Sequence, residues 1–371
     1  MSEATTSVTV TNPVEMAWFS ALCDDDYEFL GQPDEALLSS WEHCRNIVLT
    51  AERYGFDNVL LPSGYAMGID STTFAAGMAP LTDDIRLLLA IRCGELVVPQ
   101  LARQMASLDQ MLNGRLTINI ISSDIPGEQL ESEPRYRRST EVMYALRELL
   151  DGRGVDFTGE SIEVKVDPPR IRTVSGRSPL FYFGGLSPAA RECAAAGADV
   201  FLMWPDVTAK VNEVRSDMDA RAETKGRSLR YGWRSHVIVR ETEDEARAAA
   251  RRLLSKLDDA EGQKIRQRSL DSASAGVARQ AELREGADDD GYVERHLWTG
   301  VGRARSGAGA AIVGDPDQVA TKIAELRDEA NIDAFILSGY PHATECDLFA
   351  RYVLPQIPHG RLEFEPHPVT L

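Results

Sequence analysis

The chain has 371 residues, of which 43% are hydrophobic, and its formal net charge at pH 7 is −18. Barrels of alternating strands and helices reach this length as one domain. The acidic charge argues against nucleic-acid phosphates and anionic membrane surfaces as partners, because both require basic patches.

The first residues contain neither the basic nor the apolar stretch of a signal peptide, and no apolar run approaches the length of a membrane span. Five scattered cysteines form no C-x-x-C pair, so neither a zinc site nor a disulfide framework is indicated. These features predict a cytoplasmic protein without a bound metal. Residues 1–14 are small and polar, and we expect a flexible arm there, followed by a single domain over residues 15–371.

Eight short apolar segments have strand propensity, namely residues 16–22, 58–62, 85–92, 116–121, 179–185, 200–204, 230–241 and 334–340. Segments with helical spacing lie between or after them, at residues 36–54, 71–78, 98–112, 136–150, 187–196, 208–224, 242–257, 315–331 and on to 354. Residues 155–166 alternate with period two about a turn and predict an extra hairpin. The alternation of strands and helices predicts an α/β fold, a (β/α)8 TIM barrel with insertions.

Residues 257–306 interrupt this alternation between the seventh and eighth strands. They are rich in Gln, Ser, Gly and Asp, and a polar insertion of this length in a compact domain is functional or disordered. We expect a mobile lid over the barrel mouth, which would exclude water from a site beneath it. A surface loop without a role is the alternative.

Active sites of such barrels lie at the C-terminal ends of the strands. The seventh segment, RYGWRSHVIVRE, carries Arg234 and His236 two residues apart, so both side chains point to one face. An unpaired buried cation is costly, which favours a functional site, although an ordinary core ion pair fits the pattern equally well. Other strand ends carry polar, aromatic or glycine residues, namely Asn119, Ser122, Gly184, Gly185, Trp204, Ser338, Tyr340 and His342.

Two further segments are candidates for binding an anion. FGGLS at residues 183–187 ends a strand and opens a helix, where glycines admit a ligand and Ser187 is a candidate N-cap beside free amide groups. An ordinary strand–helix turn explains it as well. Arg305 stands among glycines near the end of the lid, either as a guanidinium that reaches a bound anion or as a solvated turn.

Other common sites find little support. His236 and His342 have no carboxylate at metal-ligand spacing. The chain contains neither a G-x-G-x-x-G or P-loop nucleotide motif nor a G-x-S-x-G nucleophile motif.

Five stretches, in order and with barrel spacing, resemble the bacterial luciferase-like flavin monooxygenases, and in particular the FMNH2-dependent alkanesulfonate monooxygenase group. They are LARQMASLDQMLNGRLTINI, LFYFGG, WRSHVIVRETEDEA, LWTGVGRARSGAGAAIVGDP and FILSGYPH. The resemblance implies a barrel that is usually oligomeric, here a homo-oligomer (dimer or tetramer). It also implies a two-component system, in which a separate NAD(P)H-dependent FMN reductase supplies reduced FMN. With O2 as co-substrate, a flavin–oxygen adduct then oxidises a small organic molecule.

The resemblance also assigns residues. The catalytic positions it implies are Trp204, Arg234, His236, Arg305, Tyr340 and His342. The FMN-binding positions it implies are Asn119, Tyr136, Gly184, Gly185, Leu186 and Ser187, with the phosphate near the turn at 185–187. The favoured reaction is oxidation of the carbon next to sulfur in an organosulfonate, which releases sulfite and an aldehyde.

Two loops depart from the alkanesulfonate pattern. Cys23, in LCDDD, takes the place of a His in a T-H-G-D-G-like loop, and Met67 lies nearest to the position of the group's Cys. Asp24 to Asp26 add negative charge where an anionic substrate would enter. A neutral substrate, such as a sulfone or a halogenated aromatic undergoing oxidative dehalogenation, is therefore an alternative. A deazaflavin-dependent enzyme and a non-catalytic flavin-binding protein are further hypotheses, and the intact polar strand ends argue against the latter.

Overall fold

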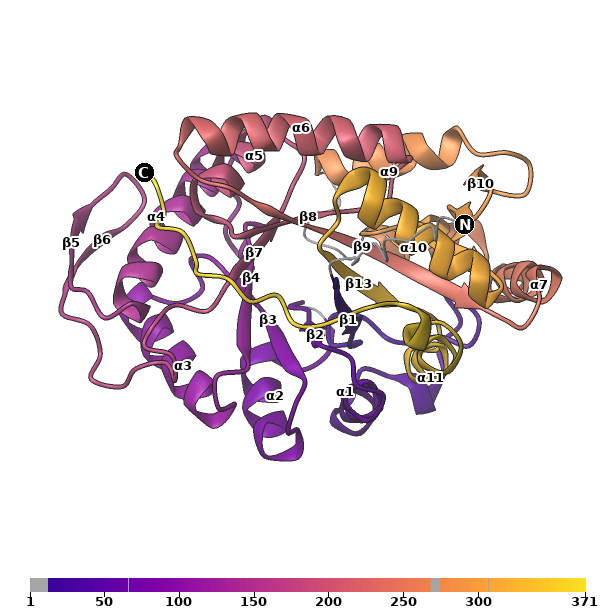
Figure 1. Cartoon of the computed structure of the whole chain (residues 1–371), viewed down its shortest axis with the longest axis horizontal. Helices are drawn as coiled ribbons and strands as arrows, with labels where there is room; N and C mark the ends of the chain where they lie inside the picture. The colour runs from indigo at the N-terminus through magenta and orange to yellow at the C-terminus, as the bar shows by residue number, and fades with distance from the viewer. Residues whose placement is uncertain (1–12, 66, 268–273, 306) are drawn as a thin grey trace, which may run out of the picture.

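The computed structural model describes residues 13–371 except Ala66, residues 268–273 and Ser306. Eight parallel strands close into a barrel (Figure 1): β1 (Glu15–Phe19), β2 (Asn58–Leu61), β3 (Arg86–Arg92), β4 (Leu116–Ile121), β7 (Phe181–Gly184), β8 (Val200–Met203), β9 (Arg230–Val239) and β13 (Ala334–Ser338). Each strand pairs with the next in this order, and β13 pairs with β1 to close the ring. The predicted barrel and all eight of its strands are confirmed.

Nine helices in the described part of the chain surround the barrel: α1 (Trp41–Arg53), α2 (Ser71–Met78), α3 (Val98–Met111), α4 (Ser132–Leu150), α5 (Pro188–Gly197), α6 (Thr208–Thr224), α7 (Glu243–Leu254), α10 (Pro316–Ala330) and α11 (His342–Tyr352). Side-chain caps fix several of their starts. The Ser40 side chain accepts from the His43 amide and begins α1, later than the spacing of apolar residues predicted. No helix of the described chain is long and apolar enough to cross a bilayer.

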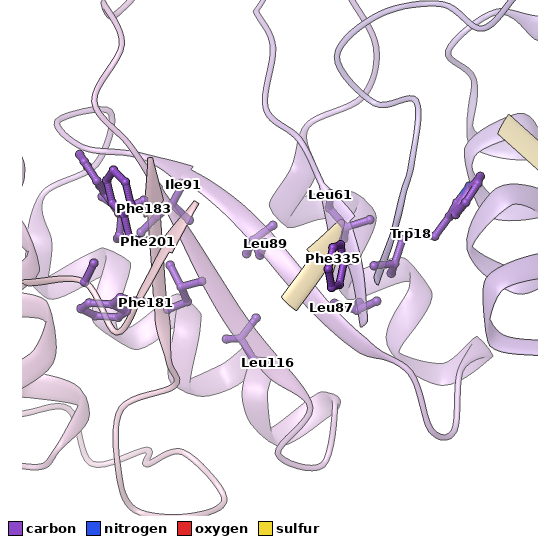
Figure 2. Close-up of a cluster of buried hydrophobic side chains, with 14 of the residues drawn as sticks. Trp18, Leu61, Leu87, Leu89, Ile91, Leu116, Phe181, Phe183, Phe201 and Phe335 are labelled. Atoms are coloured by element: carbon purple, nitrogen blue, oxygen red, sulfur yellow. The ribbon is translucent and has the colours of Figure 1, made fainter. Parts of the chain in front are cut away.

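The alternation of side chains along the strands produces two apolar layers. Leu87, Leu89 and Ile91 of β3 face the helices and belong to the large cluster between barrel and helices. Figure 2 shows these residues together with Phe181, Phe183 and Phe201, which belong to the same buried cluster. Intervening residues, such as Leu88 of β3, point into the barrel. Burial of this apolar area, at about 25 cal/mol per Å², is the main force that holds helices and strands together.

The predicted hairpin is present as β5 (Val155–Thr158) paired antiparallel with β6 (Glu163–Val166). The Glu141 carboxylate of α4 accepts hydrogen bonds from the backbone amides of Glu160, Ser161 and Ile162, at 3.0, 2.8 and 2.9 Å. The hairpin is thus held by the helix next to it.

The insertion between β9 and β13 contains more regular structure than its composition predicted. It holds α8 (Asp259–Gln267), α9 (Ala275–Glu285), β10 (Tyr292–Glu294), β11 (Leu297–Trp298) and the 3-10 turn η3 (Gly300–Arg303). β12 (Ala311–Gly314) follows and pairs parallel with the C-terminal half of β9. Part of the predicted lid, residues 268–273 and Ser306, lies outside the described residues, and the mobility of the lid stays a prediction.

The start of the described chain meets the C-terminal segment at the N-terminal ends of the strands. Of the predicted flexible arm, residues 1–12 lie outside the described residues, whereas Val14 is buried and forms a bridge with His359. The C-terminal segment crosses this end of the barrel (Figure 1), where Leu362 and Phe364 pack against interior side chains. At the opposite end, at the C-termini of the strands, the covering segment is the insertion between β9 and β13.

Candidate active site

A cavity of about 340 Å³ lies at the C-terminal ends of the strands. Eight of the residues predicted for a site line it, namely Asn119, Tyr136, Gly184, Gly185, Leu186, Ser187, Trp204 and Arg234. Two larger surface grooves, of about 430 and 670 Å³, lie outside the barrel beside α2–α3 and α10. They contain none of the predicted site residues, so we take the smaller cavity as the candidate active site.

One side of the cavity is the turn that begins α5. The Ser187 side chain accepts from the Ala190 amide at 3.2 Å, and Pro188 occupies the first helical turn. Arg191 donates from Nε to the Leu186 carbonyl at 3.1 Å and thereby braces the turn. The backbone amides at this helix start, together with the helix dipole, favour a bound anion.

The two glycines of this turn are required by the packing of the protein itself. A Cβ on Gly184 would lie 2.7 Å from the Leu202 carbonyl oxygen, and a Cβ on Gly185 would lie 2.6 Å from the Cβ of Ala190. Both distances are shorter than real Cβ contacts, so larger residues would displace β8 or α5. The turn therefore keeps its backbone open to the cavity.

Two residues with buried polar atoms, near β4 and in α4, were not predicted as site residues. Ser123 Oγ and Arg135 Nε line or border the cavity, are buried, and have no hydrogen-bond partner in the described part of the chain. Arg135 also pairs with Asp124 at 3.0 Å. Ser123 lies just after the C-terminal end of β4, and that position is the signal that could have identified it, whereas Arg135 lies in the first turn of α4.

Arg234 of β9 carries the main charge of the cavity. Its side chain donates from Nη1 to the Ser235 carbonyl at 2.6 Å, and the guanidinium carbon lies 4.3 Å from the centre of the Phe19 ring. Nη2 is buried without a partner among the described residues. Burial and the nearby Arg305 lower the pKa of Arg234 to about 9, so it remains a cation at neutral pH.

His236 lies two residues further along β9, on the same face, and is 1% exposed. Its Nδ1 is 2.9 Å from Ser338 Oγ, and its ring stacks on Tyr340 with ring centres 5.2 Å apart. Burial, together with Arg234 and Arg305, holds the pKa of His236 well below its usual value. The ring is therefore neutral at pH 7, and its buried Nε2 has no partner in the described residues.

Arg305 and Tyr340 meet beside this histidine. Arg305 donates from Nη1 to the Tyr340 hydroxyl at 2.8 Å, and its guanidinium carbon lies 5.2 Å from the centre of the Phe19 ring. Burial raises the pKa of Tyr340 to about 12, so the side chain is a phenol that retains its proton at neutral pH.

His342 completes the group of predicted residues. Its ring stacks on Phe19 at 5.7 Å and meets the Tyr340 ring edge-on at 5.0 Å. Phe19 thus contacts Arg234, Arg305 and His342. Phe19 was not predicted as a site residue, although it ends β1 and active sites lie at such strand ends. The four predicted residues that do not line the cavity form one aromatic and cationic cluster beside it.

The insertion packs directly onto the barrel mouth. Ser274, Ala275 and Gly276 line the cavity, and a Cβ on Gly276 would lie 2.8 Å from Cζ3 of Trp204. Arg279 of α9 holds Asp206 through two hydrogen bonds of 2.6 and 2.8 Å. The start of α9 therefore forms a wall of the cavity.

The two loops that depart from the alkanesulfonate pattern lie side by side. A Cβ on Gly64 would lie 3.0 Å from Cβ of Cys23, so the loops after β1 and β2 are in contact. Burial raises the pKa of the Cys23 thiol, which disfavours a reactive thiolate there. Met67 is half-buried in the second loop.

Comparisons with known proteins agree with this geometry. Residues 27–333 match the luciferase-like monooxygenase family. The chain is 63% identical over 355 residues to a sulfoquinovose monooxygenase of Novosphingobium aromaticivorans, covering 94% of this chain and 98% of the relative. It is 51% identical over 361 residues to a sulfoquinovose monooxygenase of Agrobacterium fabrum, covering 95% and 93%.

A solved structure of riboflavin lyase with modified FMN and riboflavin superposes with a TM-score of 0.75 at 16% identity, covering 93% of this chain and 91% of that one, which supports the fold. A match across most of the chain and two close relatives confirm the resemblance inferred from the five sequence stretches. The chain belongs to the luciferase-like monooxygenase family.

Proposed function

We propose that this protein is the oxygenase of a two-component system that cleaves the carbon–sulfur bond of sulfoquinovose, a hexose that carries a sulfonate. With reduced FMN and O2, the group R–CH2–SO3⁻ becomes R–CHO, and the other products are HSO3⁻, FMN and H2O. The observation that carries this proposal is the buried guanidinium of Arg234, which faces the cavity and lacks a carboxylate partner among the described residues. The two close sulfoquinovose monooxygenase relatives support the choice of substrate.

The residues around the cavity fit FMN. A volume of about 340 Å³ falls within the usual range of ligand sites. The capped start of α5 suits a phosphate, and Ser123 Oγ, which is buried without a partner among the described residues, is a further donor or acceptor for a polar ligand. Asn119, Tyr136 and Gly184 to Ser187 would hold the cofactor. When bound, reduced FMN supplies the electrons that activate O2.

The protein's own groups would bind and orient the substrate. Arg234 stabilises negative charge in a water-poor cavity, where a preorganised cation has its largest effect. Arg305 reaches the same Phe19 ring from the insertion and would hold the sulfonate, so that binding and closure are coupled. The Tyr340 phenol donates a hydrogen bond, neutral His236 offers Nε2, and Trp204 excludes water.

Within the described residues neither Arg234 nor Arg305 pairs with a carboxylate, which favours an anionic substrate over the sulfone or haloaromatic alternative. Asp24, whose charge acts on Arg305 and Tyr340, would repel a simple anion, but carboxylates accept hydrogen bonds from hydroxyl groups. A polyhydroxylated sulfonate offers a negative charge to the arginines and hydroxyl groups to the carboxylate. The non-catalytic hypothesis does not explain why two buried arginines lack carboxylate partners among the described residues.

Three further features belong to this proposal. A separate NAD(P)H-dependent FMN reductase supplies the reduced cofactor. A homo-oligomer, dimer or tetramer, is supported by exposed apolar side chains around α3, where Val97 and Met111 are 73% and 54% exposed. A reducing cytoplasmic location is supported by the five cysteines, all of which are free thiols.

Product analysis with a generic flavin reductase tests the proposal. We expect sulfite and an aldehyde from sulfoquinovose, and a much lower kcat/KM for octanesulfonate. Stopped-flow mixing of the protein and reduced FMN with O2 should give a transient absorbance absent from free FMN. Halide release from a chlorophenol without sulfite from any sulfonate would establish the neutral-substrate alternative instead. Reduced FMN that reoxidises as it does in buffer would exclude a monooxygenase.

A further inference from the structure

A buried carboxylate next to the aromatic cluster binds two histidines. Asp26 follows β1, is 0% exposed, and accepts hydrogen bonds from the backbone amides of Tyr27 and His342, each at 2.8 Å. His342 Nδ1 lies 2.8 Å from Asp26 Oδ1, and His43 Nε2 lies 2.9 Å from Oδ2. The three side chains form a continuous His–Asp–His chain from the site to α1.

This arrangement fixes which nitrogen of His342 carries the proton. Burial alone would raise the pKa of Asp26, but His342 and His43 outweigh it and hold the pKa well below its usual range. The ionised carboxylate only accepts hydrogen bonds, so His342 Nδ1 must donate to it. In the neutral ring the lone pair is then on Nε2, which is buried and has no partner among the described residues.

The two histidines of the site differ in whether a neighbouring group fixes their tautomer. His236 is hydrogen-bonded through Nδ1 to the hydroxyl of Ser338, which can donate or accept and so fixes no tautomer. His342 is backed by a carboxylate, which orients the ring and stabilises the imidazolium once a proton arrives. His342 also meets the ring of Tyr340, whose hydroxyl accepts from Arg305. Of the two, His342 is the better placed to act as a base.

We propose that His342 is the general base for carbon–sulfur cleavage, that Asp26 is the positioning residue that sets its tautomer, and that His43 anchors Asp26. The proposal rests on the proposed function, which supplies the hydroxylated carbon HO–CH(R)–SO3⁻. The O–H bond breaks and its electron pair forms the C=O bond. The C–S bond breaks with its pair on sulfur, which leaves as sulfite. The proton goes to Nε2 of His342.

The tautomer is tested first, in the protein without cofactor or substrate. Nitrogen-15 NMR of the ring nitrogens, assigned with single-histidine variants, should place the proton of neutral His342 on Nδ1 and leave Nε2 bare. In Asp26→Asn that preference should disappear. A wild-type protein with the proton on Nε2 would overturn the proposal, whatever the enzyme does with sulfoquinovose.

Catalysis is tested with sulfoquinovose, reduced FMN and a sulfite assay. We expect Asp26→Asn and His342→Gln to lower the rate of sulfite release about 10²-fold or more, with reduced FMN binding unchanged. His342→Gln leaves the Asp26 carboxylate in place, so it covers the case in which Asp26→Asn fails to fold. Asp57→Asn is the matched control, because Asp57 pairs with His359 at 2.9 Å near the opposite end of the barrel. It should lower stability without changing the rate.

The outcomes separate the two proposals. A wild-type enzyme that releases no sulfite contradicts the proposed function but leaves the tautomer result standing. A wild-type enzyme that releases sulfite, together with a His342→Gln variant of equal rate, overturns the role of His342 alone.

Discussion

Arg147 and Arg234 are both buried arginines, but their partners differ. Arg147 of α4 pairs with Asp199 at 2.6 Å, whereas Arg234 has no carboxylate partner within the described residues. A buried charge without a counter-ion costs several kcal/mol, so evolution keeps one where a bound anion compensates for it. This contrast is the clearest residue-level sign that the cavity binds a negatively charged ligand.

Replacing Arg234 with alanine should lower the rate of sulfite release about 10²-fold, because one preorganised charge is lost from a water-poor site. Arg230→Ala is the matched control, since Arg230 lies at the other end of β9, is exposed, and pairs with Asp333 at 3.2 Å. Steady-state sulfite assays compare the two. Similar rates in both variants would remove Arg234 from its assigned role.

The lowered pKa of His236 makes a prediction about stability and pH. The unfolded chain protonates this histidine near pH 6.5, whereas the folded protein keeps it neutral. Its contribution to stability is therefore complete above pH 6.5 and is lost as the pH falls. Between pH 7.5 and 5.5 the wild type should lose about 1 kcal/mol more unfolding free energy than His236→Gln. Urea titrations at both pH values measure the difference, and parallel losses would show that folding does not lower the pKa of His236.

At the scale of elements, the start of α9 determines the shape of the cavity beside Trp204. In Gly276→Ala the new Cβ would lie 2.8 Å from Trp204 Cζ3, so either the ring or the helix must move. We expect the Kd for reduced FMN to rise about tenfold, equivalent to about 1.4 kcal/mol. Gly154→Ala is the control, because its Cβ would approach no atom closer than 3.5 Å. Anaerobic fluorescence titration gives both values, and an unchanged Kd in Gly276→Ala would mean that α9 does not shape the cofactor site.

A second feature at the scale of elements is the buried ion pair that anchors α4 to the barrel. Asp199 is fully buried and binds Arg147, while its Oδ2 also accepts from the Phe181 amide at 2.7 Å. Asp199→Asn leaves a buried guanidinium without its counter-ion, and we expect a loss of about 3–5 kcal/mol in unfolding free energy. Glu148→Gln, which affects the exposed pair with Arg153, should cost less than about 1 kcal/mol. Denaturant unfolding of both variants provides the comparison, and equal losses would contradict the structural role of Asp199.

For the whole molecule, the sequence was sufficient to predict the fold and the site wherever a local residue pattern also determines where that segment lies in the folded chain. The eight strands are apolar runs, and parallel barrels place the ends of such runs together, so eight of the twelve predicted site residues line one cavity. The remaining four pack beside it, and among them Arg305 of the insertion is held there by its hydrogen bond to the Tyr340 hydroxyl, which lies just after β13.

Other features depend on contacts that no local pattern encodes. β12 has only four residues, and its partner β9 lies more than seventy residues earlier in the chain. The role of Asp26 arises from His342, 316 residues away. In the sequence, Asp26 is only one of three adjacent aspartates in a loop, which suggested entrance charge and not a buried ligand of two histidines.

The central claim is that this barrel couples oxidation of reduced FMN to cleavage of a sugar sulfonate. The most direct measurement is a single-turnover reaction in which protein-bound reduced FMN and sulfoquinovose are mixed with O2, and sulfite is quantified against FMN oxidised. The account predicts close to one sulfite per FMN, and none when O2 is left out. Complete FMN oxidation with no sulfite would contradict it.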